Sequence, residues 1–182
     1  MKIVICGASL PPFDKAILKK SYEIGIEIAA NKHTLRCGAC RGYPYEAAKG
    51  CFTNNGRVEA ISPARNKEEH INHYKFPTQN FTEIYYTGLG IPGRNLPLVV
   101  NSDAIILISG QIGTLNEFTI AFHNKKPIGI LEGSGGITNI VREIAEICRK
   151  VNQGNTIIYE KEPERLIREL AALKKSFGEF FQ

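Results

Sequence analysis

Short apolar runs alternate with helical stretches along this chain, and that alternation restricts its possible folds more than any other feature. Residues 2–6, 57–62 and 103–109 have the length and apolar character of buried strands, whereas residues 12–30 carry apolar side chains at helical spacing. The same patterns predict further strands at 33–37, 83–87, 127–132 and 156–160, and further helices at 43–54, after Gly93, and at 113–124, 137–151 and 162–177. Such an order is typical of an α/β protein, so we predict a three-layer, doubly wound, Rossmann-like parallel sheet with helices on both faces.

The length and composition are those of a single globular domain, which we expect to span residues 1–182. No apolar stretch approaches the roughly 18 residues that a membrane span needs, so no membrane partner is expected. The formal net charge of +5 mildly favours an anionic ligand, but no basic run predicts a nucleic-acid partner. Five cysteines, an odd number, in a chain without a signal-peptide pattern indicate a cytoplasmic protein.

Glycine clusters follow three of the expected strands: Cys6-Gly7-Ala8-Ser9, residues 37–42 and residues 109–114. Ligands of parallel α/β sheets bind beyond the carboxyl ends of the strands, where these clusters fall. In the third cluster, two glycines open a helix whose N–H groups could hold an anion, although a tight strand-to-helix turn needs glycine in any case. The expected ligand-binding residues are Gly7, Ser9, Gly38, Gly42, Ser109, Gly110, Gln111, Gly113 and Thr114.

Glu117 and Arg94 are the charged residues of interest near these turns. Glu117 follows Thr114 by three positions, which is the spacing of a capping box and favours a purely structural role. Arg94 lies in the stretch GIPGRNLP, where a lone arginine is usually solvated. Because the turns after neighbouring strands converge, the two side chains could also form a cation–carboxylate pair around a sugar phosphate.

Other motifs favour structural roles. Cys37 and Cys40 form a C-x-x-C that could be redox-active or half of a zinc site, but no second pair exists and buried cysteine is common. His70 and His73 have a spacing that permits metal binding, yet a solvated helix face is the simpler interpretation. No metal site is predicted. The polar stretch 63–82 is long for a structureless loop, so we expect it to be functional or partly helical.

Taken together, these residues resemble the LOG (LONELY GUY) family, part of a wider group of SLOG-type nucleotide-binding domains often mislabelled as lysine decarboxylases. The family signature Pro-Gly-Gly-x-Gly-Thr-x-x-Glu is similar to residues 109–117, Ser-Gly-Gln-Ile-Gly-Thr-Leu-Asn-Glu. Arg94 precedes Glu117 by 23 positions, as the family arginine precedes the family glutamate. The glycine-rich residues 38–42 also have a counterpart in the family. The resemblance covers most of residues 1–150.

The resemblance implies that Arg94 and Glu117 are a catalytic pair. LOG enzymes hydrolyse the N-glycosidic bond of cytokinin riboside 5′-monophosphates to free base and ribose 5-phosphate. The phosphate would bind to the backbone N–H groups around Gly113 and Thr114, and Glu117 would stabilise the cationic sugar or activate water. Ser109 and Gln111 depart from the signature, in place of its proline and its second glycine, which indicates a sister branch.

The sequence therefore leaves two alternative functions open. The first is hydrolysis of a nucleoside 5′-monophosphate; the second is binding or carriage of a phosphorylated nucleotide or cofactor without turnover, as in the related molybdenum-cofactor carriers. In both cases the partner is a phosphorylated, nucleotide-like small molecule, and no resident cofactor is expected. By analogy with LOG relatives, we expect a homodimer with helix 113–124 at its contact.

Overall fold

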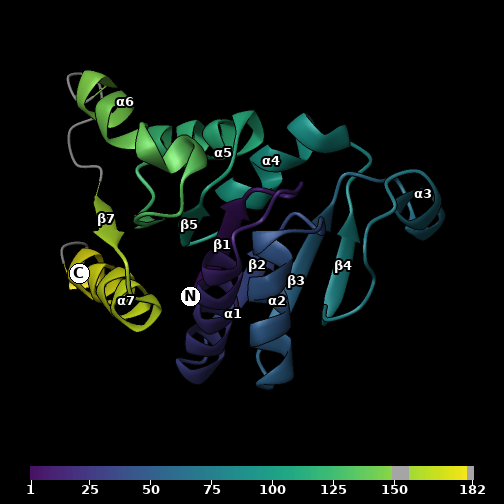
Figure 1. Cartoon of the computed structure of the whole chain (residues 1–182), viewed down its shortest axis with the longest axis horizontal. Coiled ribbons are helices and arrows are strands. Elements are labelled where there is room, and N and C mark those ends of the chain that lie inside the picture. Colours follow the sequence, from purple (N-terminus) through teal and green to yellow (C-terminus); the bar gives the residue numbers. More distant parts are fainter. Residues whose placement is uncertain (149–155, 180–182) are drawn as a thin grey trace.

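The computed structural model describes residues 1–148 and 156–179, and it contains one seven-stranded parallel sheet (Figure 1). The strand order is β4-β3-β2-β1-β5-β6-β7, and every neighbouring pair runs parallel. The strands are β1 (Lys2–Gly7), β2 (Thr34–Cys37), β3 (Arg57–Ser62), β4 (Glu83–Tyr86), β5 (Ala104–Ile108), β6 (Ile128–Leu131) and β7 (Ile157–Glu160). The predicted Rossmann-like α/β fold is confirmed, and each strand lies within one or two residues of its predicted position.

Helices cover both faces of the sheet and bury two separate cores. On one face lie α1 (Lys15–Ala30), α2 (Tyr43–Thr53) and α7 (Pro163–Glu179), whose apolar residues pack against Ile3, Ile5 and Ile106. On the other face lie α4 (Gly90–Val100), α5 (Ile112–His123) and α6 (Val141–Cys148), which pack against Val4, Ile105 and Leu107. The alternation of these strand residues between the two cores explains why the strands are continuously apolar.

The strand order reverses between β1 and β5, which are neighbours at the middle of the sheet. Strands β2, β3 and β4 extend from β1 in one direction, and β5, β6 and β7 extend in the other. The loops that leave β1 and β5 therefore diverge, and a crevice opens between them at the carboxyl edge of the sheet. This position locates the candidate site.

Several helix boundaries differ from their predictions. Helix α1 begins at Lys15 and not at residue 12, because the Asp14 carboxylate caps it by accepting the N–H groups of Ala16 at 2.7 Å and Ile17 at 3.1 Å. The predicted helix 137–151 consists of a 3₁₀ turn (Gly136–Asn139) followed by α6, and residues 149–151 lie outside the described part of the chain.

Helix α4 is the largest correction, because it begins at Gly90 and not after Gly93, so Arg94 lies inside the helix and not at its start beside a glycine loop. Gly90, Gly93 and Pro97 are poor helix formers, so the local sequence gives little sign of this helix. Burial of Leu98 and Val99 against the sheet stabilises it despite that composition.

The segment 63–82 is partly helical, as predicted, through α3 (Lys67–Asn72). Its anchor is His70, which is fully buried, although we expected a solvated face there. The two ring nitrogens of His70 lie 2.9 Å from Ser62 Oγ and 2.9 Å from the carbonyl oxygen of Pro77. Because that carbonyl can only accept, Nε2 carries the proton in this pair.

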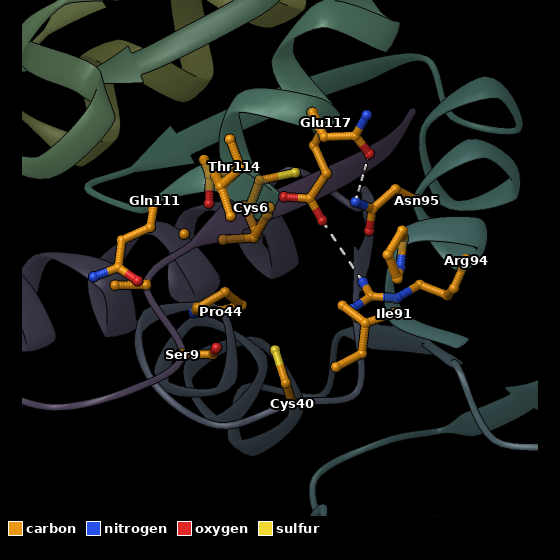
Figure 2. A pocket seen from close by; sticks show the side chains of 18 of the residues that line it. Cys6, Ser9, Cys40, Pro44, Ile91, Arg94, Asn95, Gln111, Thr114 and Glu117 are labelled. Atoms are coloured by element: carbon orange, nitrogen blue, oxygen red, sulfur yellow. Dashed lines mark hydrogen bonds and ion pairs between the residues drawn. The ribbon is translucent and has the colours of Figure 1, made fainter. Parts of the chain in front are cut away.

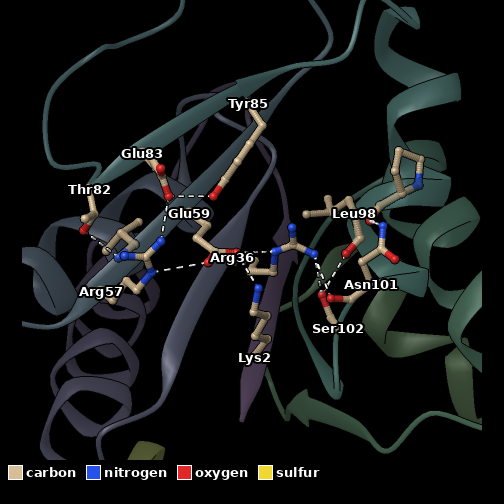
Figure 3. Close-up of polar contacts among 12 residues, drawn as sticks. Lys2, Arg36, Arg57, Glu59, Thr82, Glu83, Tyr85, Leu98, Asn101 and Ser102 are labelled. Carbon is tan, nitrogen blue, oxygen red and sulfur yellow. Dashed lines mark hydrogen bonds and ion pairs between the residues drawn. The ribbon is translucent and has the colours of Figure 1, made fainter.

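At the amino-terminal end of the sheet, charged side chains join three strands (Figure 3). The buried carboxylate of Glu59 lies 3.0 Å from Arg36 Nε and 3.3 Å from both Lys2 Nζ and Arg57 Nε. Burial works against ionisation, but the hydrogen bond from Lys2 and the charge of Arg36 hold the pKa of Glu59 below its ordinary value. This network ties β1, β2 and β3 together at the end opposite the crevice.

Candidate functional site

The crevice at the carboxyl edge contains a pocket of about 340 Å³ (Figure 2). Its walls come from four segments that are far apart in the sequence: the turns after β1 and β2, and the first halves of α4 and α5. A cavity of this size at a strand-order reversal is the usual position for a small-molecule ligand in this class of fold. The lining residues are Ile5, Cys6, Gly7, Ala8, Ser9, Leu10, Gly38, Cys40, Pro44, Ile91, Pro92, Arg94, Asn95, Gln111, Ile112, Gly113, Thr114, Asn116 and Glu117.

The start of α5 forms one end of the pocket. The first hydrogen bond of the helix runs from the N–H of Leu115 to the carbonyl oxygen of Gln111, at 2.9 Å. The N–H groups of Ile112, Gly113 and Thr114 therefore have no partner within the helix. A Cβ atom at Gly113 would meet no atom within 4 Å, so this backbone is open to the pocket. Free N–H groups and the helix dipole make this end a potential anion site.

The turn before α5 has an unusual backbone that explains its sequence. Ser109 and Gly110 both have positive φ angles, +54° and +96°, and the N–H of Ser109 donates to Ser134 Oγ at 2.7 Å. Proline, which the LOG signature has at this place, could adopt neither that φ nor that hydrogen bond. Gly110 lies against the side chain of Thr114, and a Cβ atom there would collide with it.

Three of the predicted ligand residues support the pocket without lining it. Ser109 and Gly110 shape the turn behind it, and Gly42 adopts a φ of +78° where a Cβ atom would collide with the carbonyl oxygen of Ala8. That same carbonyl accepts the N–H of Tyr43 at 3.0 Å, so the turns after β1 and β2 are fastened together.

The other end of the pocket is formed by Arg94, a residue of which only 4% of the surface is exposed. Its guanidinium lies directly over Gly38, where any Cβ atom would collide with it. Glu117 Oε1 is 3.6 Å from Arg94 Nη1, close enough for an ion pair but too far for a hydrogen bond. Among the described residues, Arg94 Nε has no hydrogen-bond partner.

Glu117 lies in the second turn of α5 and presents its carboxylate to the pocket between these two ends (Figure 2). Burial raises the pKa of Glu117, and Arg94 and a hydrogen bond from the Cys6 thiol only partly oppose that effect. The capping-box interpretation is wrong, because α5 begins at Ile112 with Gln111 as its N-cap, so Thr114 is already inside the helix.

The structure thus brings most of the predicted site residues to one pocket. Gly7, Ser9, Gly38, Arg94, Gln111, Gly113, Thr114 and Glu117 all line it. The sequence pattern missed Cys6, Ala8, Asn95 and Asn116, which are immediate neighbours of predicted residues. The amide of Asn95 donates to Asn116 at 2.8 Å and joins α4 to α5. The sequence pattern also missed Ile5, Leu10, Cys40, Pro44, Ile91, Pro92 and Ile112.

The C-x-x-C motif is divided between two environments. Cys37 is buried in the core, where burial raises the pKa of its thiol to about 12, whereas the side chain of Cys40 lines the pocket. A thiol with so high a pKa is a poor nucleophile and a poor metal ligand. In the described part of the chain, no group of three or more His, Cys, Asp or Glu side chains is placed to hold a metal ion.

Sequence comparison identifies a family and a relative for this chain. The model of the SLOG cluster4 family matches residues 1–167. An uncharacterized protein of Archaeoglobus fulgidus is 32% identical over 133 residues, which cover 72% of this chain and 80% of that protein.

Two solved structures share the fold. The molybdenum cofactor binding protein of Rippkaea orientalis superimposes with a TM-score of 0.77 at 24% identity and covers 94% of this chain and 96% of its own. The molybdenum cofactor carrier protein of Chlamydomonas reinhardtii has a TM-score of 0.73 at 20% identity and covers 96% of each chain. At these identities the likeness establishes the shared fold alone. The molybdenum cofactor is the ligand of those two proteins.

A more distant likeness bears on nucleic acids. DNA processing protein A of Helicobacter pylori, described as binding single-stranded DNA, has a TM-score of 0.63 at 16% identity and covers 97% of this chain and 81% of its own. The absence of a nucleic-acid partner therefore stays a prediction. Within residues 1–148 and 156–179, no helix has the length and apolarity to span a membrane.

Proposed function

This chain belongs to the SLOG cluster4 family, and from that premise we propose that its pocket binds a phosphorylated, nucleotide-like small molecule. The observation that carries the proposal is the group of three N–H donors at the start of α5, which open into a pocket that also contains a buried arginine. A phosphate at Gly113 and Thr114 would take up these donors and the positive end of the helix dipole.

The remaining walls suit the rest of such a molecule. Ile91, Pro92 and Pro44 offer apolar surface to a flat ring, and Glu117 lies about one helical turn beyond Gly113, or roughly 6 Å along the axis. That separation places its carboxylate near the sugar of a nucleotide whose phosphate is at Gly113. The ring would then lie beyond the sugar, toward Arg94.

Binding or carriage without turnover is the function that these features support best. It needs only the donors and walls described above, whereas hydrolysis also needs the Glu117 carboxylate to reach a water or the sugar. Only 7% of the surface of Glu117 is exposed, and its carboxylate faces Arg94 and the Cys6 thiol. The molybdenum cofactor of the two similar structures is one candidate cargo, in keeping with this proposal.

The test of binding is an NMR titration with ribose 5-phosphate, which carries the phosphate and sugar without a base. We expect the amide resonances of Gly113 and Thr114 to shift, while those of α3, remote from the pocket, stay in place. Ribose is the matched control, because it lacks the phosphate and should cause no shift at these amides. Saturating ribose 5-phosphate that leaves both amides unchanged would contradict the proposal.

Hydrolysis of an N-glycosidic bond is the second candidate, favoured by the pairing of Arg94 with a carboxylate of raised pKa. It is tested by incubating the protein with AMP and with IMP and separating the products by chromatography. We expect no free base and no ribose 5-phosphate. Release of both products by the wild-type protein, but not by Glu117→Gln, would establish the hydrolase in place of the carrier.

A further inference from the structure

The guanidinium of Arg94 has hydrogen-bonding capacity that the protein leaves unused. Nε is buried and unpartnered among the described residues, and the carboxylate of Glu117 is beyond hydrogen-bond distance at 3.6 Å. An unpaired donor on a buried charged group costs free energy. A buried arginine with an unpaired donor therefore indicates that the ligand supplies the missing acceptor.

Arg94 is also held in a fixed position. Gly38 supports one side of the guanidinium, because no Cβ atom separates that backbone from it, and the charge of Glu117 attracts Nη1 from another. A planar fork of donors that is already oriented loses little freedom on binding, which favours bidentate recognition.

The position of Arg94 in the pocket identifies the part of the ligand that it would meet. In Figure 2, Arg94 and Gln111 lie at opposite sides of the pocket, and Gln111 is the N-cap of the helix that would hold the phosphate. A nucleotide bound by its phosphate at α5 would therefore direct its base toward Arg94, along the apolar side chain of Ile91.

Arginine offers donors only, so it discriminates between purines. Its fork pairs with a carbonyl oxygen at position 6 and the adjacent ring nitrogen N7, whereas the 6-amino group of adenine would face it donor to donor. Of the nearby acceptors, Asn116 Oδ1 already accepts the amide of Asn95, and the Glu117 carboxylate faces Arg94 and the Cys6 thiol.

We propose that Arg94 is a specificity-determining residue that selects 6-oxopurine nucleotides over 6-aminopurine nucleotides. This inference rests on the proposed binding of a phosphorylated ligand and adds the class of its base. IMP and AMP form the sharpest pair of probes, because they differ only in the group at position 6 and in the hydrogen that the 6-oxo form carries on N1.

The experiment measures the dissociation constants of IMP and AMP by calorimetry. For the wild-type protein we expect IMP to bind at least about tenfold more tightly, the discrimination typical of a bidentate base contact. In Arg94→Met the ratio should fall to near one, and in Arg94→Lys, which keeps the charge but loses the fork, it should fall to an intermediate value. Arg65→Met removes a largely exposed arginine on the segment before α3 and should leave the ratio unchanged.

The outcomes separate the two proposals. If ribose 5-phosphate binds but AMP binds as tightly as IMP or more tightly, the selection by Arg94 is wrong and the phosphate site stands. A preference for IMP that persists in both Arg94 variants also overturns the role of Arg94. If none of the three phosphates binds, both proposals fail together. Melting curves of the two variants confirm that each is folded before its affinities are compared.

Discussion

At the scale of single residues, Glu117 has a carboxylate whose charge is disfavoured in the folded protein. Burial raises its pKa above the ordinary carboxyl value, and the attraction of Arg94 does not fully offset this. The stability that the protonated group contributes is therefore fully present below the ordinary pKa and is lost as the pH rises through the raised one. Wherever the pH exceeds that raised pKa, ionised Glu117 costs the free protein stability.

The change Glu117→Gln should therefore leave the protein as stable as the wild type, or more stable, at pH 8. At pH 4, which is below the ordinary carboxyl pKa, the difference should shrink, because the wild-type group is then largely protonated and resembles glutamine. Melting temperatures of both proteins at the two pH values measure the effect. A Gln variant that melts several degrees below the wild type at pH 8 would show that the ion pair with Arg94 is net stabilising.

Gly38→Ala tests the contact that positions Arg94. The added methyl group collides with the guanidinium, so we expect a loss of about 1–3 kcal/mol in the free energy of unfolding, typical of overpacking. Denaturant titration measures this cost. If the collision with Arg94 is its cause, the same change should cost clearly less in an Arg94→Ala background. Equal costs in the two backgrounds would place the strain elsewhere.

At the scale of elements, the first turn of α5 should respond in opposite ways to two glycine substitutions. Gly113→Ala meets no neighbouring atom and replaces a poor helix former, so stability should rise by up to about 1 kcal/mol. Its methyl group nevertheless points to the pocket, and ribose 5-phosphate should bind at least severalfold more weakly. Gly110→Ala, at a φ of +96° and against Thr114, should lose about 1–3 kcal/mol.

Melting curves and the same NMR titration check both changes. Unaltered affinity for ribose 5-phosphate in a well-folded Gly113→Ala protein would argue against phosphate binding at this turn. A Gly110→Ala protein as stable as the wild type would show that the turn can relax to another conformation.

The segment 63–82 depends on His70 for its attachment to the sheet. His70→Leu keeps an apolar side chain in the buried site but leaves the Pro77 carbonyl and the Ser62 hydroxyl without their partner, which should cost about 2–3 kcal/mol. His73→Leu, at an exposed position three residues away, is the matched control and should change stability by less than about 0.5 kcal/mol. Urea denaturation of both variants distinguishes an anchor from a surface residue.

The sequence predicts strands better than it predicts the helices at the site. Strand β5 is a continuous apolar run, and a buried parallel strand requires that pattern, so its position follows directly. Helix α4 contains two prolines and two glycines, and its existence depends on contacts with the sheet that no local pattern encodes. The role of Thr114 was misjudged for a related reason, since a shift of the helix start by a few residues converts a cap into an interior residue.

At the scale of the whole molecule, several of the exposed apolar side chains belong to β4, α4 and the start of α5, whereas others, such as Phe52, lie elsewhere. Leu89, Leu96 and Val100 project from α4 or its N-cap, Tyr85 lies on the neighbouring strand β4, and Ile112 at the start of α5 is 80% exposed. The outward residues of α5 itself, Asn116, Thr119 and His123, are polar. The homodimer that we expect would therefore use α4 together with the start of α5, and not α5 alone.

Leu96→Glu tests this interface by placing a charge at the centre of the exposed α4 surface, where the leucine is 55% exposed. We expect light scattering at micromolar concentration to give the mass of a dimer for the wild type and of a monomer for the variant. Phe52→Glu, on α2 and the opposite face of the sheet, is 41% exposed and should remain dimeric. A monomeric wild-type protein would refute the homodimer.

The pocket as a whole was only partly predictable, and the missing part has a physical cause. Glycines such as Gly7 and Gly113 mark the turns, and Arg94 and Glu117 have distinctive chemistry, so each can be found in the sequence. Ile91 and Pro44 are ordinary apolar residues whose place in the pocket depends on how two distant segments pack. Spatial proximity of this kind follows from the assembled sheet and the helices packed on it, and not from any local pattern.

Among the described residues, those that line the pocket all come from the first 117 positions, and Ser134 and the turn at Gly136 contact the backbone behind it. Helix α7, near the carboxyl terminus, lies on the opposite face of the sheet from α4 and α5 (Figure 1). That arrangement makes the carboxyl terminus the appropriate end for attaching a fluorescent reporter or an affinity handle. Exposed positions of α7, such as Glu164 and Arg168, can therefore vary without altering any residue that lines the pocket.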